Sequence, residues 1–274
     1  MTEKLISDGL ALLDLDEDGV GRLRLNRPEA SNGMNVPFLR ALYDAVMAAH
    51  GEPRLRVLLL TGEGPNFCAG GDVKTFASKG AALPDYLREA TAWLQTCVQG
   101  LLSLQVPVIA SVHGYAAGGG GFGLVCASDI VIAGESAKFL AGATRVGMAP
   151  DAGVSVTLPH LVGLRKAMEI ILTNPVLTAA EALQIGLVTR VVPDDVLAGQ
   201  SLELARSLAC GATRALGAAK RLVWSGLGAR VEAQLPEEAR TVAELSGTED
   251  AREGLAAVIE RRAPRFHGSP DGAP

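Results

Sequence analysis

The chain has 274 residues, 48% of them hydrophobic and 20% charged, with a formal net charge of −5. This composition is typical of a globular protein and excludes a disordered chain, which would carry fewer apolar residues. Broad nucleic-acid binding is also disfavoured, because it needs a basic face that this charge balance does not supply.

The sequence also bears on location. The first ten residues, MTEKLISDGL, lack the apolar core of a signal peptide, and no apolar run approaches the roughly 20 residues that cross a bilayer. We therefore expect a cytoplasmic protein that does not bind membranes. The chain has four cysteines, at positions 68, 97, 126 and 210, which are scattered and form no C-x-x-C pair. This distribution favours reduced thiols and predicts no metal site.

Strands and helices alternate over the first 195 residues. Residues 10–15 and 20–25 flank a turn and predict a hairpin. Pro37 can open a helix whose apolar face holds Phe38, Leu42 and Val46. Short apolar runs then predict strands and periodic segments predict helices: strands at 57–60, 106–112, 130–133 and 186–192, and helices at 82–104 and 122–127. This alternation predicts an α/β fold.

The character of the chain changes after Pro193. Helical periodicity extends over 196–210, 213–224, 231–245 and 250–262, with no strand pattern between these segments. We therefore predict a core at 1–195, a helical extension at 196–268 and a frayed tail at 269–274.

Two glycine-rich segments follow buried strands. One is Phe67-Cys-Ala-Gly-Gly-Asp72, and the other is His113-Gly-Tyr-Ala-Ala-Gly-Gly-Gly-Gly-Phe-Gly123. Glycine lets the backbone approach a ligand closely, and a helix that opens after such a segment presents unpaired N–H groups. Two strand ends of one sheet can thus aim two N–H groups at one oxygen. This pattern predicts an oxyanion hole for an acyl carbonyl.

A dinucleotide site is the rival interpretation of the second segment. Gly118, Gly120 and Gly123 satisfy G-x-G-x-x-G. The glycines begin five residues beyond the strand, however, and the following helix is too short for an ordinary βαβ crossover. A purely structural role, in which the glycines only allow close packing, is a further alternative.

Three motifs together resemble the crotonase (enoyl-CoA hydratase/isomerase) superfamily. They are the segments 25–35, 59–72 and 107–121, which contain LNRPEASNGMN, LLTGEGPNFCAGGD and PVIASVHGYAAGGGG. The resemblance implies a crotonase-like ββα spiral core with a C-terminal helical trimerisation region. It implies a homotrimer or dimer of trimers, and a coenzyme A thioester as substrate with no separate cofactor.

The resemblance also implies site residues. The oxyanion donors match the N–H groups of Ala69 and Gly120, or Gly119 if the glycine run is aligned from the strand side. Arg24 is a further candidate for contacts with the CoA phosphates. The acyl-CoA-binding positions match Arg27, Ala30, Gly70, Gly71, Asp72 and Lys74.

The residues at the positions that match the family's catalytic residues limit the reactions that this chain could catalyse. Hydratases of the family resemble one another in two glutamates, which match Gly123 (Phe122 in the other alignment) and Ala143 here, so a two-glutamate hydration is disfavoured. Asp151 matches the aspartate of the branch that includes ring-epoxide isomerases of phenylacetyl-CoA breakdown. We therefore expect an acyl-CoA isomerase in which Asp151 carries the proton.

Several alternatives stay open. The chain could be a hydratase or a thioester hydrolase with water held by other residues, or a catalytically silent CoA-binding subunit. A dehalogenase is disfavoured, because its histidine and tryptophan match Gln95 and Ala143. Asp151 could also only cap a turn. Four other side chains are weaker candidates for the site: His113, Glu63, Glu89 and Trp93. Segment 73–95 is the expected mobile wall of the acyl pocket.

Overall fold

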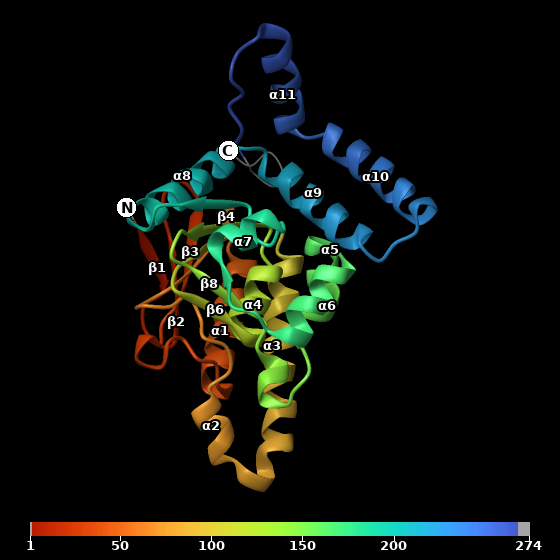
Figure 1. The fold of residues 1–274 in the computed structure, drawn as a ribbon. Helices are drawn as coiled ribbons and strands as arrows, with labels where there is room; N and C mark the ends of the chain where they lie inside the picture. The colour runs from red at the N-terminus through yellow and green to blue at the C-terminus, as the bar shows by residue number, and fades with distance from the viewer. Residues whose placement is uncertain (1, 268–274) are drawn as a thin grey trace.

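A computed structural model describes residues 2–267 (Figure 1). Its larger sheet confirms the expected hairpin and the predicted buried strands. β2 pairs antiparallel with both β1 and β3, and every later pairing in this sheet is parallel. In spatial order the strands are β1 (Glu3–Ile6), β2 (Ala11–Leu15), β3 (Val20–Leu25), β4 (Val57–Gly62), β5 (Val108–Val112), β7 (Ile130–Gly134) and β10 (Arg190–Val192).

A smaller sheet stands beside the first. It contains β6 (Tyr115–Ala117), β8 (Lys138–Leu140) and β9 (Leu177–Thr178). An isolated bridge between Cys68 and Ala116 brings the two glycine-rich segments together, and a second bridge joins Met34 to Gly71 of the first segment. Strands of the two sheets and helices follow one another as the chain advances, which is the ββα spiral of the crotonase fold.

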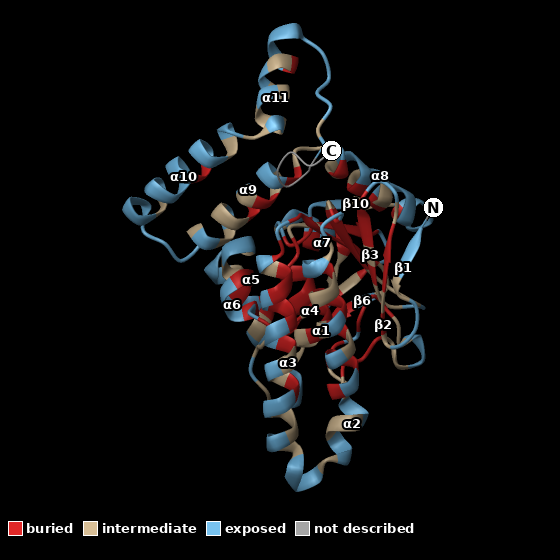
Figure 2. Cartoon of the chain, turned by 180° about the vertical axis from the view of Figure 1, so that it is seen from behind, coloured by how far each residue is buried: buried red, intermediate tan, exposed pale blue. Residues whose placement is uncertain are grey.

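The predicted helices after Pro37, at 82–104 and at 122–127 are confirmed, and the core contains further helices beside them. Together they are α1 (Val36–Gly51), α3 (Leu83–Ser103), α4 (Gly118–Cys126), α5 (Val154–Val162), α6 (Leu164–Thr173) and α7 (Ala179–Gln184). Asn35 caps α1 by accepting from the N–H of Phe38 at 3.0 Å, and Thr178 with Glu181 forms a capping box at the start of α7. Burial is concentrated in the sheet, α1 and α4 (Figure 2).

The second glycine run is not a loop. Residues 118–121 form the first turn of α4, which begins four residues earlier than predicted. This helix leads from β6 of the small sheet to β7 of the large one. It therefore does not connect two strands of one sheet, as a dinucleotide-binding βαβ unit would.

α8 (Leu197–Ala209) changes the expected domain boundary. It packs on the sheet face opposite α1, where Leu197, Ala205 and Ala209 are buried against side chains of β3, β4, β5 and β7. The boundary predicted at 195 is thus too early, because this helix is needed to cover the sheet. The last predicted segment, 269–274, lies outside the described residues.

The remaining helices project from the body at the end opposite the arm described below (Figure 1). They are α9 (Thr213–Gly226), α10 (Val231–Ser246) and α11 (Glu249–Glu260). A buried ion pair anchors α9, since Lys220 Nζ lies 2.9 Å from Asp129 Oδ2. Apolar side chains on the far helices face outward, with Val258 and Ile259 exposed by 78% and 81%.

Segment 73–95, which we call the arm, extends from the other end of the molecule (Figure 1). It comprises α2 (Val73–Ser78), a 3-10 turn (Gly80–Ala82) and the first half of α3. Tyr86 joins it to the core by accepting a hydrogen bond from the N–H of Val36 at 3.0 Å. None of the helices in the described part of the chain is both long and apolar enough to cross a membrane.

Candidate active site

A cavity of about 420 Å³ lies where the two glycine-rich segments meet. One wall is the start of α4, with Gly118, Gly119 and Gly120, and another is formed by Ala69 and Gly71. The arm contributes an apolar wall, and segment 140–151 closes the remaining side. The apolar wall consists of Val73, Phe76, Leu87, Ala90 and Leu94.

The backbone around Gly71 is fixed by a parallel bridge to Met34. The N–H of Met34 donates to the carbonyl of Gly70 at 2.7 Å, and the N–H of Asp72 donates to the carbonyl of Met34 at 2.8 Å. Gly71 lies between these two bonded residues, and its own N–H therefore points away from Met34. Gly71 lines the cavity, and none of residues 2–267 accepts a hydrogen bond from its N–H.

The expected donor at Ala69 is corrected by the same network. The N–H of Ala69 already donates to the carbonyl of Ser31 at 2.9 Å, so it is not available to an oxyanion. The sequence predicts Gly71 only as an acyl-CoA-binding residue. The bridge that distinguishes the two N–H groups joins residues 37 positions apart, and no local pattern in the sequence reveals it.

The first turn of α4 offers the second donor. The leading N–H groups of a helix have no partner one turn earlier, and they lie at the positive end of its dipole. Gly120 is buried, and in the described part of the chain its N–H has no acceptor. A Cβ at Gly120 would lie 2.9 Å from Met34 Sδ and 3.2 Å from Cys68 Sγ, so only glycine fits against the first segment.

Asp151 lies directly against α4. A Cβ built on Gly119 would overlap Asp151 Oδ1 and would lie 2.5 Å from Asp151 Cγ. Burial raises the pKa of Asp151 above its ordinary value, because the charged form is poorly solvated. Asp151 is the single acidic residue among the described residues that line the cavity.

The two positions expected to match the hydratase glutamates are both occupied by small residues. Ala143 lines the cavity with a methyl group. Gly123 is buried against Ala152, whose Cβ would lie 2.5 Å from a Cβ at position 123. Neither position supplies a proton carrier.

Arg27 and Asp72 bind each other. Arg27 Nη1 lies 2.8 Å from Asp72 Oδ2 and donates to the Gly33 carbonyl at 2.6 Å. Asp72 also caps α2 by accepting from the N–H and the hydroxyl of Thr75 at 3.0 and 2.7 Å. Burial raises the pKa of Asp72, but the bonds from Thr75 and Arg27 outweigh it and lower the value to about 2. This pair therefore holds the segment that carries Gly71.

The other predicted acyl-CoA-binding residues lie around the cavity without lining it. Gly70 is buried with φ at +97°, and a Cβ there would lie 2.8 Å from the Ala117 carbonyl oxygen. Ala30 belongs to a 3-10 turn, Pro28–Ala30. Lys74 is exposed on α2. Of the six, Gly71 alone lines the cavity among the described residues.

The weaker candidates are held elsewhere. His113 Nε2 lies 2.9 Å from the carbonyl oxygen of Gly64, with which it shares a hydrogen bond. Glu63 accepts from Arg24 at 2.8 Å, and Arg24 also donates to Asp14 at 2.8 Å. These contacts give Arg24 and Glu63 structural partners outside the cavity.

Glu89 and Trp93 lie on α3 but face away from the cavity. Glu89 Oε1 lies 2.7 Å from Arg40 Nη2. Trp93 packs edge-on against Tyr43 of α1, with ring centroids 5.3 Å apart. Both residues therefore contribute to the packing between α1 and α3.

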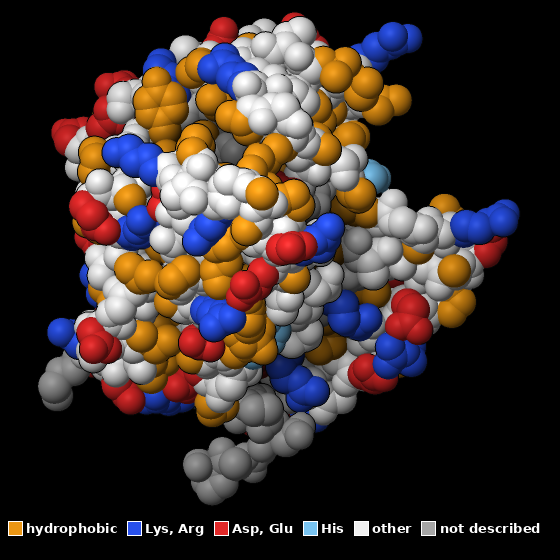
Figure 3. Space-filling model, turned by 90° about the horizontal axis from the view of Figure 1, so that it is seen from below, with side chains coloured by type: hydrophobic (Ala, Val, Ile, Leu, Met, Phe, Trp, Pro, Cys, Tyr) orange, Lys and Arg blue, Asp and Glu red, His pale blue; other side chains and the backbone are white. Residues whose placement is uncertain are grey.

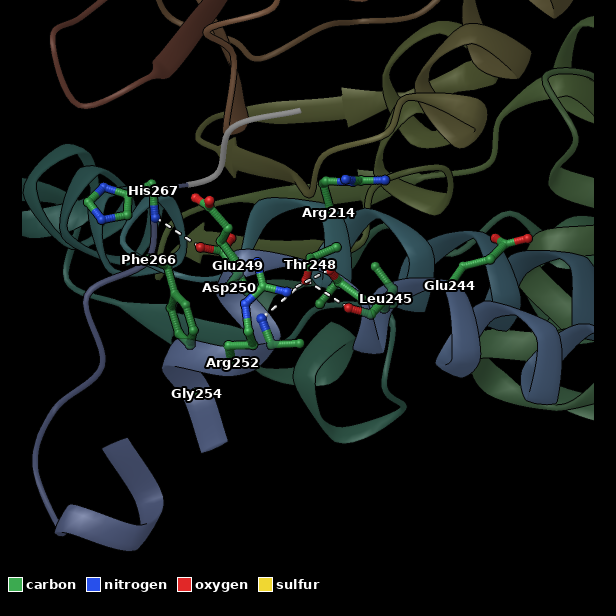
Figure 4. A pocket seen from close by; sticks show the side chains of 14 residues that line it. Arg214, Glu244, Leu245, Thr248, Glu249, Asp250, Arg252, Gly254, Phe266 and His267 are labelled. Atoms are coloured by element: carbon green, nitrogen blue, oxygen red, sulfur yellow. Dashed lines mark hydrogen bonds between the residues drawn. The ribbon is translucent and has the colours of Figure 1, made fainter. Parts of the chain in front are cut away.

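A second cavity, of about 470 Å³, lies among α9, the α10–α11 connection and residues 266–267 (Figure 4). Its groups bind one another, since the N–H of His267 donates to Asp250 at 3.0 Å and Arg252 donates to the Gly247 carbonyl at 3.1 Å. It contains neither glycine-rich segment. The face seen from the arm carries charges of both signs among apolar side chains, with no broad basic patch (Figure 3).

Known proteins match this chain over nearly its whole length. The sequence profile of the enoyl-CoA hydratase/isomerase family matches residues 16–269. A Rhodobacter capsulatus protein named "probable enoyl-CoA hydratase" is 38% identical over 263 residues and 96% of each chain. The 1,2-epoxyphenylacetyl-CoA isomerase of Escherichia coli K12 is 37% identical over 92% of this chain and 96% of its own. A crystal structure of enoyl-CoA hydratase from Bacillus anthracis has a TM-score of 0.89 at 32% identity, over 95% of this chain and 100% of that one. The chain therefore belongs to the enoyl-CoA hydratase/isomerase family.

Proposed function

We propose that the protein is an acyl-CoA isomerase in which Asp151 moves a proton between two carbons of the acyl group. The observation that carries this proposal is one half-buried carboxylate that lines the same cavity as two backbone N–H groups with no described acceptor. The N–H groups are those of Gly71 and Gly120, with Gly71 in place of the Ala69 expected earlier. Gly119, the other donor considered, is assigned to contact with Asp151.

The proposed reaction needs one base and one oxyanion site. The thioester oxygen accepts hydrogen bonds from Gly71 and Gly120, which makes a neighbouring C–H more acidic. Asp151 takes that proton and becomes a neutral carboxylic acid, while the electrons pass to the oxygen as an enolate. The same acid then returns the proton to another carbon, so atoms and charge balance.

The environment of Asp151 suits this role. A raised pKa makes its carboxylate a stronger base than an exposed aspartate, and the neutral acid formed after proton abstraction is favoured by burial. The positive end of the α4 dipole favours the enolate oxygen near Gly120. These features also favour an active enzyme over a silent CoA-binding subunit.

The CoA moiety would lie outside the cavity. We assign its phosphates to Lys74, which is exposed on α2 and forms no ion pair with any of residues 2–267. Arg27, Ala30, Gly70 and Asp72 shape the segment that carries Gly71. No separate cofactor is required by this reaction, because the CoA thioester is itself the substrate.

Asp151→Asn tests the assignment. The amide cannot accept the proton, so we expect isomerisation to fall by about 10²–10⁴-fold, the usual contribution of a general base. Binding of a non-reactive acyl-CoA analogue should be retained, as measured by calorimetry. Isomerisation at the wild-type rate in this variant would remove Asp151 from its role.

Hydration is the second candidate, because relatives named as probable enoyl-CoA hydratases match 90% or more of the chain. A panel of 3-enoyl-, 2-enoyl- and ring-epoxide-CoA substrates distinguishes the two. Isomerisation of a 3-enoyl- or ring-epoxide-CoA without hydration of crotonyl-CoA supports our proposal. Ordinary hydration of crotonyl-CoA would favour the hydratase.

A further inference from the structure

The turn that carries Asp151 lies across α4 at two glycines. Gly119 and Gly123 are four residues apart and therefore share one face of the helix. A Cβ at Gly119 would overlap the Asp151 carboxylate, and a Cβ at Gly123 would lie 2.5 Å from Ala152 Cβ. The side chains of Asp151 and Ala152 thus occupy the space beside α4 that is open because residues 119 and 123 are glycines.

The backbone of this turn is held in an unusual conformation. Ala152 has φ at 51° and Gly153 has φ at 75°, both in the left-handed region. A non-glycine residue adopts this region at a cost and persists there when its surroundings hold it. Ala152 is 1% exposed, so its methyl group is fixed against Gly123. The direction of the preceding Asp151 side chain is fixed with it.

We propose that Gly119 and Gly123 form a socket on α4 that seats Asp151 at the cavity, which makes both glycines positioning residues. This inference rests on the proposed function of Asp151. Gly123 then has a positioning role, because the absence of a side chain there leaves room for Ala152. A glutamate at 123 and the observed position of Ala152, the residue that follows Asp151, exclude each other on steric grounds.

Gly119→Ala tests the socket with little disturbance elsewhere. The three atoms nearest to the added Cβ are Oδ1, Cγ and Oδ2 of Asp151, so the side chain that must move is Asp151. Alanine also favours the helix that contains it. We expect kcat/KM for isomerisation to fall by about 10²-fold, as for a misplaced catalytic group. The affinity for a non-reactive acyl-CoA analogue should stay unchanged.

The pH profile separates positioning from a general structural effect. In the wild type, kcat/KM falls at low pH as Asp151 becomes protonated. Once Asp151 turns toward solvent, burial raises its pKa less, so the acidic limb should move to lower pH in Gly119→Ala. Gly199→Ala is the matched control. It adds a methyl group to a glycine of α8 with nothing within 4 Å, and it should change neither rate nor profile.

A double variant completes the test. Gly119→Ala combined with Asp151→Asn should be no slower than Asp151→Asn alone, because both changes act on one group. Gly123→Ala should also slow isomerisation, because the backbone at Ala152 must shift. Wild-type activity in Gly119→Ala, or lost activity with an unmoved acidic limb, would overturn the socket.

The socket and the proposed function fail in different ways. If Asp151→Asn isomerises normally, the proposed function is wrong. A crystal structure of Gly119→Ala then still decides the socket. A displaced Asp151 side chain supports it, and an unmoved side chain refutes it.

Discussion

Two aspartates near the two glycine-rich segments have opposite environments. Asp151 lines the cavity and has few bonds to its carboxylate, so burial raises its pKa. Asp72 follows Gly71 directly and receives bonds from Thr75 and Arg27, which bring its pKa to about 2 despite burial. One carboxylate is thus suited to exchanging a proton, and the other remains charged and holds the backbone.

Arg27→Ala should destabilise the segment that carries Gly71. The change removes a hydrogen-bonded ion pair from a carboxylate whose side chain is only 9% exposed, and we expect a loss of about 1–3 kcal/mol in urea unfolding. Arg88→Ala, which breaks the exposed pair with Asp85, is the control and should cost less than about 1 kcal/mol.

The sign of the pH dependence follows from the lowered pKa of Asp72. Its stabilising contribution is present above the ordinary value of 3.8 and is lost as pH falls through about 2. The difference between wild type and Arg27→Ala should therefore be largest near neutrality and shrink toward pH 2. A difference that does not depend on pH would contradict the ion pair as its source.

At the scale of elements, the arm forms one wall of the cavity. Its residues Phe76, Leu87, Ala90 and Leu94 form an apolar wall opposite segment 140–151. Leu87, Ala90 and Leu94 lie on one face of α3 because they are three and four residues apart, so all three side chains can line the cavity. The expectation that this arm is mobile stays a prediction.

Ala90→Phe should shorten the acyl chains that the enzyme accepts. The added ring fills space in the cavity, and each methylene that loses burial costs about 0.8 kcal/mol. We expect kcat/KM to fall with increasing chain length, while the shortest substrates react as in the wild type. Gln99→Phe, an exposed position on the same helix, is the control. Equal losses for all chain lengths would argue against Ala90 as part of the acyl wall.

At the scale of the whole molecule, α9, α10 and α11 extend from a complete core. Their outward apolar side chains include Val242, Leu255, Val258 and Ile259, and we propose that they pack in a homotrimer or dimer of trimers. Full burial of one such side chain is worth about 1.5–3 kcal/mol. A threefold assembly repeats each contact three times.

Val258→Glu with Ile259→Glu tests this proposal. Burying two carboxylates in an apolar contact is unfavourable, so sedimentation should show monomers in place of the assembly. Helical content by circular dichroism should be retained. Glu260→Gln, at the same helix end, should leave the assembly intact. An assembly of unchanged size in the double variant would move the interface elsewhere.

The hairpin, the buried strands of the larger sheet and the helices α1 and α3 could be predicted because their signals are local, whereas α5, α6 and the short strands of the smaller sheet were not predicted. Apolar runs, helical periodicity and the Thr178 capping box all depend on residues close in sequence. The glycine run at 118–121 is harder to predict, since glycine has a poor helix propensity. Its place in α4 depends on contacts with Cys68 and Met34, which lie far away in the chain.

Local patterns in the chain were enough to establish the family resemblance, the order of many of the strands and helices, and the position of Asp151 in its motif. Which N–H groups are free depends on the tertiary fold. Ala69 donates to Ser31 and Gly71 does not, because a bridge to Met34 turns the backbone between them. The way in which Asp151 reaches the cavity also depends on the fold, because its seat on α4 is formed by two glycines distant from it in sequence. Both outcomes result from pairings between distant segments, which no local pattern encodes.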